Sequence, residues 1–488
     1  MKVLFITPPL GAWVTHGIHR APNQMHAQLA AYIREKKIGE PLVLDCRALD
    51  LNYDEMKKEV HRINPDVVVL GEILHSTGGV AVIAHFNKTA KIIKEINPNI
   101  KIVVGGLWYS ALYKDTLRDN PSIDFVIVGE PELTLEELLK ELSSAQKDFA
   151  HIAGLASRAD GKIVVGPHRH LIADLDILPL PAYDLFPMDK YIGHTYWNNF
   201  CELMTSRGCP GGCSFCYEWS QYDPRHPQDF VSWRAHSAER VLDELELLTT
   251  KFGVKTVVFQ DDAFNVNKDM VEKVCRGILK RNIKLNWVIL GRADDWARQV
   301  DLLGLMKEAG LFMGLLGIEV ANNEELQKLG KGVTVEQIKL SIDGLRANNI
   351  ASVGTFMIGF DDDDEQKIKE RFQFADELDP DVFALQFVTP VPGSPLWTYL
   401  IKNGRLKPNE IDLRKWDFQH PVVPTRFLSI EDVGRLGSWC MREFFSRPER
   451  IQRIMSSNYS VLAKLCIRDF MENVSKFEAA ATRGQTYV

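Results

Sequence analysis

The chain lacks any apolar run long enough to cross a membrane, because about 18 uninterrupted apolar residues are needed and none of its 488 residues begins such a run. Its N-terminus, MKVLFITPPLGAW, is apolar for too short a stretch before Pro8 and Pro9 to form a secretory signal, and it reads better as a buried first strand. We therefore expect a protein without a membrane span that resides in the cytoplasm.

The chain has no excess of positive charge and few cysteines. A formal net charge of -7 provides no basic surface to attract nucleic acid, so nucleic-acid substrates are disfavoured. Only eight cysteines occur, and five of them are scattered through apolar or helical patterns. Such scattering is typical of reduced structural thiols and not of a disulfide framework. The five are Cys46, Cys201, Cys275, Cys440 and Cys466.

Strand-like and helix-like patterns alternate from the first residues to about residue 148. Near-continuous Val/Ile/Leu strands such as VVVL at 67–70, separated by helical stretches, predict a parallel sheet covered on both faces. Residues 1–148 are therefore predicted to form an open doubly wound α/β domain. Ligands of such sheets bind at the carboxyl ends of the strands. In this chain those ends are Pro8-Pro9, residues 71–79, Gly105-Gly106 and Gly129-Glu130.

The rest of the chain divides into three further parts. Residues 149–198 contain ILPLPAYDLFP, whose prolines prevent a regular helix or a central strand, and we predict an ordered connector. Six strand–helix units follow within residues 199–400. Because a full eight-unit barrel takes roughly 250 residues, a partial (β/α)6 barrel is predicted. A capping-box-like spacing of Ser429 and Asp432 opens a helical pattern, so residues 401–488 are predicted to form a helical C-terminal domain.

Three cysteines, Cys209, Cys213 and Cys216, lie within eight residues in the stretch TSRGCPGGCSFCYEW. The glycines and proline of this stretch allow the tight turns that bring three thiolates together, and clustered thiolates select zinc or iron–sulfur clusters. A structural zinc site needs a fourth ligand, which His226 or His236 could supply. A chance cluster of buried thiols fits so glycine-rich and polar a segment less well.

A cubane 4Fe–4S cluster explains in a different way why the loop contains three cysteines and not four. It has four irons, so three cysteines leave one iron without a protein ligand, and that iron can chelate a small molecule through an amino and a carboxylate group. The loop also follows the first strand of the second alternating series, at the end where barrel enzymes build their active sites. The residues by themselves leave both zinc and a cubane open.

The pattern CxxxCxxC after the first strand of a partial barrel resembles the radical S-adenosylmethionine (SAM) superfamily. This resemblance implies a 4Fe–4S cluster on Cys209, Cys213 and Cys216, with SAM bound at the open iron. It extends to the later strand ends FQDDAF, GRADD, GIE and MIGF, which in that family surround SAM. The implied SAM-binding residues are Phe215, Asp261, Asp262, Arg292, Glu319 and Gly359.

The first domain resembles the cobalamin-binding domains that precede some radical SAM barrels, in VVVLGE, VVGGLWYSA and VIVGEPE. The resemblance continues through LPLPAYDLFP, WDFQHPVV and FFSRPERI, so it covers nearly the whole chain. No D-x-H-x-x-G motif is present, so the histidine that binds cobalt in many cobalamin proteins is missing. The implied cobalamin-binding residues are Pro8, Pro9, Gly71, His75, Ser76, Thr77, Gly105, Gly106, Gly129 and Glu130.

The resemblance implies a cobalamin-dependent radical SAM C-methyltransferase. Its reduced cluster would cleave SAM to a 5′-deoxyadenosyl radical that takes a hydrogen atom from an unactivated carbon. Methylcobalamin would then methylate that carbon, and a second SAM would remethylate the cobalamin. The implied partners are an external one-electron reductant of the flavodoxin or ferredoxin type and a substrate that is either a protein or peptide side chain or a small molecule.

Two alternatives to methylation remain at this point. Some relatives with the same layout form rings or act as other non-methylating oxidoreductases, as the anaerobic cyclase of chlorophyll biosynthesis does. The other alternative is a cobalamin- or metal-binding module without catalysis, which requires the residues at the barrel strand ends to be a coincidence. Detection of a methylated product would exclude the first alternative, and cleavage of SAM would exclude the second.

Overall fold

The computed structural model describes residues 1–9, 18–72, 81–106 and 108–483. Its first domain is built on a sheet with strand order β2-β1-β3-β4-β5-β6-β7, and the first five strands in the chain are parallel. These five are β1 (Lys2–Thr7), β2 (Glu40–Asp45), β3 (Val67–Glu72), β4 (Lys101–Gly106) and β5 (Phe125–Ile127).

Helices cover both faces of this sheet, as the strands' continuous apolar sequences predict. Side chains of α2, α3 and α4 pack on one face with Leu4 and Val68, and those of α1 and α5 pack on the other with Val3 and Val67. The doubly wound α/β architecture is therefore confirmed. The helices are α1 (Gln24–Glu35), α2 (Tyr53–Ile63), α3 (Val82–Ile96), α4 (Tyr113–Asp119) and α5 (Pro131–Leu142).

The connector is more regular than its sequence predicts. It begins with an antiparallel hairpin, β6 (Leu155–Ala159) and β7 (Lys162–Val165), which extends the first sheet. The sequence prediction lacked this hairpin because it rested on the downstream prolines and not on the Asp160-Gly161 turn, where both residues have positive φ. Beyond it the chain forms only short 3-10 turns and a small hairpin, in keeping with its prolines. These are η3 (Leu175–Ile177), η4 (Tyr183–Leu185), η5 (Met188–Lys190), β8 (Ile192–Gly193) and β9 (Trp197–Asn198).

The central part of the chain is a partial barrel of six parallel strands in chain order, as predicted. Helices on its outer side separate successive strands, and Asp364 is the N-cap of α12, where its side chain accepts the Lys367 N–H. The strands are β10 (Phe200–Leu203), β13 (Thr256–Phe259), β14 (Asn286–Arg292), β15 (Leu311–Glu319), β16 (Ala351–Ile358) and β17 (Val382–Phe387). The helices are α6 (Ala238–Lys251), α7 (Lys268–Lys280), α8 (Ala293–Arg298), α9 (Leu303–Glu308), α10 (Asn323–Lys328), α11 (Val335–Ala347) and α12 (Glu365–Leu378).

Short elements decorate the loops of the barrel. A two-stranded hairpin, β11 (Ser206–Arg207) with β12 (Arg234–Ala235), brackets the cysteine-containing loop. The 3-10 segments are η6 (Tyr217–Ser220), η7 (Pro227–Val231), η8 (Phe264–Val266), η9 (Val300–Leu302), η10 (Pro408–Glu410) and η11 (Leu413–Lys415).

The C-terminal part is helical, as predicted. Ser429 caps α14 by accepting the backbone N–H of Asp432, which the sequence spacing indicated. The helices are α13 (Pro395–Lys402), α14 (Ile430–Phe445), α15 (Pro448–Ser456), α16 (Val461–Glu472) and α17 (Val474–Arg483). Among all the helices described, none combines the length and the apolar character that a bilayer crossing requires.

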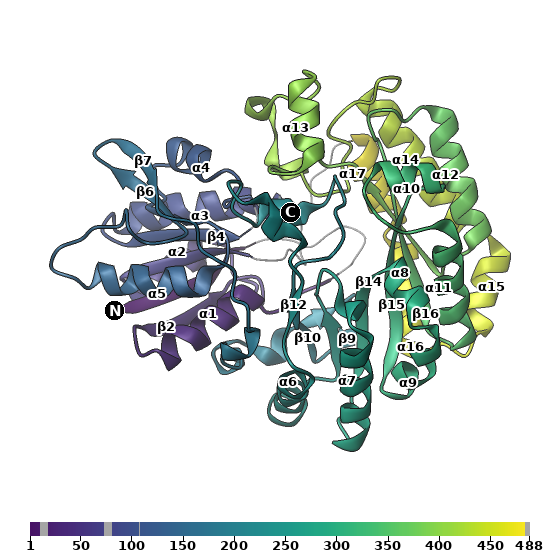
Figure 1. The fold of residues 1–488 in the computed structure, drawn as a ribbon, viewed down its shortest axis with the longest axis horizontal. Coiled ribbons are helices and arrows are strands. Elements are labelled where there is room, and N and C mark those ends of the chain that lie inside the picture. The colour runs from purple at the N-terminus through teal and green to yellow at the C-terminus, as the bar shows by residue number, and fades with distance from the viewer. Residues whose placement is uncertain (10–17, 73–80, 107, 484–488) are drawn as a thin grey trace.

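The segment that follows the last barrel strand, β17, packs against the first domain. In Figure 1 the first domain lies on the left, the barrel on the right, and α13 between them at the top. Trp397 of α13 meets Trp108 of the first domain edge to face, with ring centroids 5.9 Å apart. Trp416 and Phe418 belong to the same apolar cluster as the core of the first domain. This packing fixes the carboxyl ends of both sets of strands next to each other.

Candidate active site

The three clustered cysteines lie in the loop between β11 and η6, beyond the carboxyl end of the first barrel strand. Cys209, Cys213 and Cys216 all line one cavity of about 300 Å³ inside the barrel. The loop turns sharply at Gly208, where φ is +79° and a Cβ would lie 2.4 Å from the carbonyl oxygen of Ser232. The backbone N–H of Gly211 points to Cys209 Sγ at 3.4 Å. The structure therefore places all three cysteines on the wall of one cavity.

The histidines considered for a zinc site are engaged elsewhere. The ring of His226 stacks on that of His168 with centroids 3.6 Å apart, and His236 Nδ1 lies 3.0 Å from Asp176 Oδ1. Within the described part of the chain, no group of three or more His, Cys, Asp and Glu side chains is arranged around a single metal ion. Three thiols on one cavity wall suit a cubane instead, because each cysteine then binds a different iron.

Apolar side chains from successive strands form most of the cavity wall. A wall of this kind excludes water, which protects a reactive intermediate and strengthens the polar contacts at the strand ends. These apolar residues are Val258, Val288, Leu290, Met313, Leu315 and Val353.

Arg292 lies at the end of β14, beside the cysteine loop. Its Nε donates to Asp294 Oδ1 at 3.0 Å and one Nη donates to the Lys331 carbonyl oxygen at 2.8 Å. The other, Nη1, is buried without a hydrogen-bond partner among the described residues, and it lies against Gly211, whose Cβ would be 2.1 Å away. A buried donor left without a partner is costly, so this position fits an anionic group held next to the cysteines.

We expect Gly211→Ala to weaken the binding of SAM or of the cluster, while Gly212→Ala has little effect. A methyl group at 211 displaces the Arg292 guanidinium, and overpacking of this kind costs about 1–3 kcal/mol. At 212 the nearest atom to a Cβ is the Gly330 carbonyl oxygen at 3.9 Å, an ordinary contact. Iron content and SAM affinity of the two reconstituted variants check this. Equal losses in both would contradict the role given to Arg292.

Glu319 forms a buried ion pair that the sequence did not reveal. Its Oε1 lies 2.8 Å from Lys331 Nζ, with the two side chains 9% and 6% exposed, and Thr355 donates to the same carboxylate at 3.2 Å. Burial lowers the pKa of Lys331, but Glu319 outweighs it and the net shift is upward. Lys331 is therefore charged in the cavity. The signal that could have found it is G-K-G at 330–332, where both glycines have positive φ.

The predicted SAM-binding residues divide into two groups. Phe215, Asp262, Arg292 and Glu319 line the barrel cavity. Asp261 instead supports the start of the cysteine loop, because its Oδ1 accepts the Thr205 backbone N–H at 2.9 Å and the Ser206 hydroxyl at 2.5 Å. Burial raises the pKa of Asp261 to about 7, although these hydrogen bonds lower it.

Gly359 also lies outside the residues that line the cavity. Its φ is +94° and its N–H donates to Asp363 Oδ2 at 2.8 Å, so its position reflects a turn after β16. Phe215, by contrast, lies on the cavity wall and packs edge to face on Phe360, with centroids 6.0 Å apart. Contacts of these residues with SAM stay predictions.

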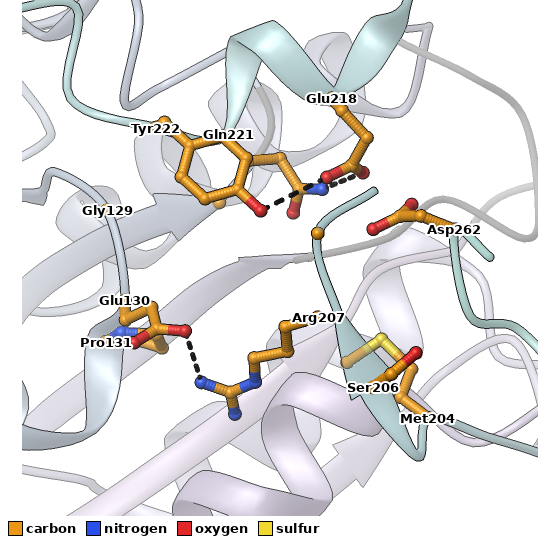
Figure 2. Close-up of a pocket in the computed structure, with 12 residues that line it drawn as sticks. Gly129, Glu130, Pro131, Met204, Ser206, Arg207, Glu218, Gln221, Tyr222 and Asp262 are labelled. Carbon is orange, nitrogen blue, oxygen red and sulfur yellow. Dashed lines mark hydrogen bonds and ion pairs between the residues drawn. The ribbon is translucent and has the colours of Figure 1, made fainter. Parts of the chain in front are cut away.

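A second, smaller pocket lies where the first domain meets the cysteine loop (Figure 2). Gly106, Gly129 and Glu130 of the first domain line it. From the barrel side, Glu218 and Asp262 line both this pocket and the barrel cavity. The two pockets therefore meet at this pair of carboxyl groups. Burial raises the pKa of both groups, so a proton is retained between them more readily than in water.

Buried ion pairs hold the two domains together at the rim of this pocket. Arg207, two residues before Cys209, lies 3.1 Å from Glu130 Oε1 and 2.5 Å from Glu132 Oε1. Arg234 lies 2.8 Å from Glu130, and the contact of Arg207 with Glu130 is drawn in Figure 2. Glu130, a predicted cobalamin-binding residue, thus forms ion pairs with two arginines. Its visible role is to dock the first domain on the cysteine loop.

The other predicted cobalamin-binding residues have varied surroundings. A Cβ on Gly71, where φ is +122°, would lie 2.1 Å from the Gly105 carbonyl oxygen, so the neighbouring strand itself requires glycine there. Gly129 has no atom within 4 Å of its Cβ position and leaves open space in the pocket. Pro8 and Pro9 follow β1. Outside the described residues lie His75, Ser76 and Thr77.

Comparisons with known proteins agree with this arrangement. The model of the B12 binding domain matches residues 5–139, and that of the radical SAM superfamily matches residues 203–375. An uncharacterised methyltransferase of Pyrococcus horikoshii, PH0819, is 31% identical over 96% of this chain and 98% of its own length. The anaerobic magnesium-protoporphyrin IX monomethyl ester cyclase of Rubrivivax gelatinosus is 28% identical over 87% of this chain and 73% of its own length.

Solved structures show the same fold. The cobalamin-dependent SAM radical enzyme OxsB, with aqua-cobalamin and SAM bound, has a TM-score of 0.71 at 17% identity, covering 98% of this chain and 71% of that one. The radical SAM methyltransferase TsrM from Kitasatospora setae, with cobalamin and a [4Fe–4S] cluster bound, has a TM-score of 0.67 at 16% identity. That match covers 97% of this chain and 99% of that one.

Fold and site together define an enzyme in which a parallel α/β ligand-binding domain faces the thiol-lined cavity of a partial barrel. The chain belongs to the family of cobalamin-binding radical SAM enzymes, given its full-length relative and the two matching domain models. Its cofactors are a 4Fe–4S cluster, SAM and cobalamin. A cluster thus takes the place of the zinc site that the sequence left open.

Proposed function

We propose that the protein is a C-methyltransferase that adds a methyl group to an unactivated carbon of its substrate in the cytoplasm. The observation that carries this proposal is the meeting of the two pockets at Glu218 and Asp262. A methyl donor in the first domain and a radical source in the barrel can then act on one substrate carbon. The relatives over most of the chain include the hopanoid C-3 methylase of Methylococcus capsulatus, which is 27% identical over 80% of this chain.

The chain's own residues bind and orient the reactants. When bound, SAM at the cluster supplies a radical that abstracts hydrogen, and cobalamin supplies the methyl group. Cys209, Cys213 and Cys216 hold the cluster. Arg292 presents Nη1, for which no described residue is an acceptor, to an anionic group such as the SAM carboxylate, and Lys331 adds positive charge beside it. The apolar strand residues keep water away from the reacting carbon. An external flavodoxin- or ferredoxin-type protein provides the electron.

A non-methylating cyclisation is the second candidate, because cyclases are among the relatives over more than four fifths of the chain. The two are separated by following the methyl group. The reconstituted, reduced enzyme is incubated without oxygen with a cell extract and SAM that carries a trideuterated methyl group. We expect a product with that label, formed with one S-adenosylhomocysteine and one 5′-deoxyadenosine per methyl group. An unlabelled, ring-closed product would support the cyclase instead.

A further inference from the structure

A buried pair of titratable side chains, separate from the residues assigned so far, lies inside the barrel. His19 Nε2 and Glu202 Oε1 are 2.8 Å apart, and their side chains are 4% and 3% exposed. Glu202 is on β10 and His19 comes from the first domain, and both line the cavity that the three cysteines line. An ionisable pair in so apolar a cavity calls for a physical reason, because removing a carboxylate from water costs several kcal/mol.

Hydrogen bonds hold the carboxylate of Glu202 in one orientation. Its Oε1 accepts from His19 and also from Gln260 Nε2 at 3.1 Å. The ring of His19 is fixed in turn by edge contacts with His194 and Phe200, with centroids 5.3 and 5.1 Å apart. Oε2 of Glu202 has no hydrogen bond from any residue that the structure describes. Glu202 therefore presents one acceptor oxygen to which no described residue donates.

A purely structural clamp between the domains would not need this arrangement. The ion pairs of Arg207 with Glu130 and Glu132 already join the domains, and they lie outside the barrel cavity. Glu202 instead faces the cavity beside apolar side chains, with Val258 opposite it on the neighbouring strand β13 and Val288 at the same level on β14. One fixed polar group on an apolar wall is the usual means by which a binding site orients an otherwise apolar ligand.

We propose that Glu202, positioned by His19 and Gln260, binds the polar head of a substrate that is otherwise apolar, and that this head is a hydrogen-bond donor, a hydroxyl or an amine. Because Oε1 already accepts from Gln260 and lies against His19, Oε2 offers an acceptor to a head that donates, and a carboxylate or phosphate head without a hydrogen has nothing to donate. Glu202 lies on the strand and the cysteines lie beyond its end, so the carbon that reacts is not the one that carries the head. This inference rests on the proposed function and specifies its substrate class.

The test uses three probes that have the same unbranched carbon skeleton and differ in the polar head group. They are n-hexanol, n-hexylamine and hexanoate, each deuterated on its alkyl carbons. They are added to the full-length protein with cluster, cobalamin and SAM bound. Calorimetry measures their binding, and mass spectrometry measures deuterium transferred to 5′-deoxyadenosine after reduction. We expect hexanol and hexylamine to bind about tenfold or more tightly than hexanoate, as one hydrogen bond to a charged group provides.

Glu202→Gln should abolish most of this preference, with cluster and cobalamin content unchanged. Glu244→Gln is the matched control, because Glu244 is equally buried but lies on α6, outside the residues that line the cavity. Gln260→Leu serves as a second variant should Glu202→Gln fail to fold, and it should reduce the preference by a smaller factor. Equal binding of the three probes, no binding of any of them, or an unchanged preference in these variants overturns the inference.

Failure of the head-group site and failure of the proposed function have different signatures. A head-group preference without any cleavage of SAM contradicts the proposed function and leaves the site standing. Cleavage of SAM and formation of a methylated product, without a preference for donor heads, leaves the function standing and contradicts the site. Deuterium in 5′-deoxyadenosine from hexanol, and its decrease in Glu202→Gln, supports both.

Discussion

Cys213→Ala, and likewise Cys209→Ala or Cys216→Ala, is expected to remove the iron–sulfur cluster and reduce SAM cleavage to background. The three thiols line one cavity wall, and a cubane held by only two of them loses an iron site. Without the cluster no open iron remains to bind SAM, so the loss is complete and not graded. Iron and sulfide analysis, the electron paramagnetic resonance signal of the reduced protein and the yield of 5′-deoxyadenosine measure it.

Cys275→Ala is the matched control for this experiment. Cys275 is fully buried in α7 and belongs to the core between that helix and the barrel. Its replacement removes one sulfur atom from the core and should cost stability but keep full iron content and SAM cleavage. Retention of the cluster in all three loop variants would show that the loop does not hold it. Loss of the cluster in Cys275→Ala would point to a general folding defect.

Arg207→Met is expected to destabilise the protein by about 3–5 kcal/mol, the usual effect of removing one partner of a buried ion pair. The change leaves Glu132, whose side chain is fully buried, without its cation and Glu130 with Arg234 alone. Because these residues join the first domain to the start of the cysteine loop, cobalamin and cluster content should fall as well. Denaturant unfolding of the full chain and cofactor analysis measure the two effects.

A neutral side chain at Glu132 should restore much of this loss. The double variant Arg207→Met, Glu132→Gln leaves neither glutamate position with an unpaired charge, because Glu130 keeps Arg234, and a buried ion pair replaced on both sides is often close to neutral in stability. A double variant that is less stable than Arg207→Met would mean that the arginine acts through packing and not through charge. Arg62→Met, which loses an exposed contact with Glu59, should leave stability nearly unchanged.

The same ion pairs predict how stability depends on pH. Burial raises the pKa of Glu130, but Arg207 and Arg234 lower it further, so the net shift is below the ordinary value of 4.5. A group with a lowered folded-state pKa contributes its stabilisation above the unfolded pKa and loses it as the pH falls through the folded value. The wild-type protein should therefore lose stability on acidification below about pH 4.5, and Arg207→Met should show a smaller acid-dependent loss in unfolding experiments.

Much of the fold could be predicted because its signals are local. The barrel strands read as short apolar runs between helical patterns, and the helix start at Ser429 was visible as a cap. The hairpin at residues 155–165 was missed although it is local, because its Asp-Gly turn was outweighed by the prolines that follow. Exact domain boundaries at residues 148, 198 and 400 remain predictions.

The candidate site could be predicted only where its residues form a motif. Arg292 and Glu319 were found from their strand-end positions, and both line the cavity. Lys331, which pairs with Glu319, follows α10 and has no strand-end signal. Asp261 and Asp262 are adjacent in sequence, yet one supports the cysteine loop and the other faces the cavity. Neighbouring residues on an extended chain point to opposite sides, and the sequence does not say which side is the cavity.

The sequence by itself determined that three thiols share one tight loop and that this loop follows the first strand of a partial barrel after a parallel α/β domain. Cysteine spacing and apolar periodicity depend on neighbours along the chain, so both could be read directly. Only the tertiary structure decided that Arg207 docks that loop on Glu130 and Glu132, and that His19 reaches Glu202 across 183 residues. Such contacts follow from how the two domains pack, and no local pattern encodes which distant charges will meet.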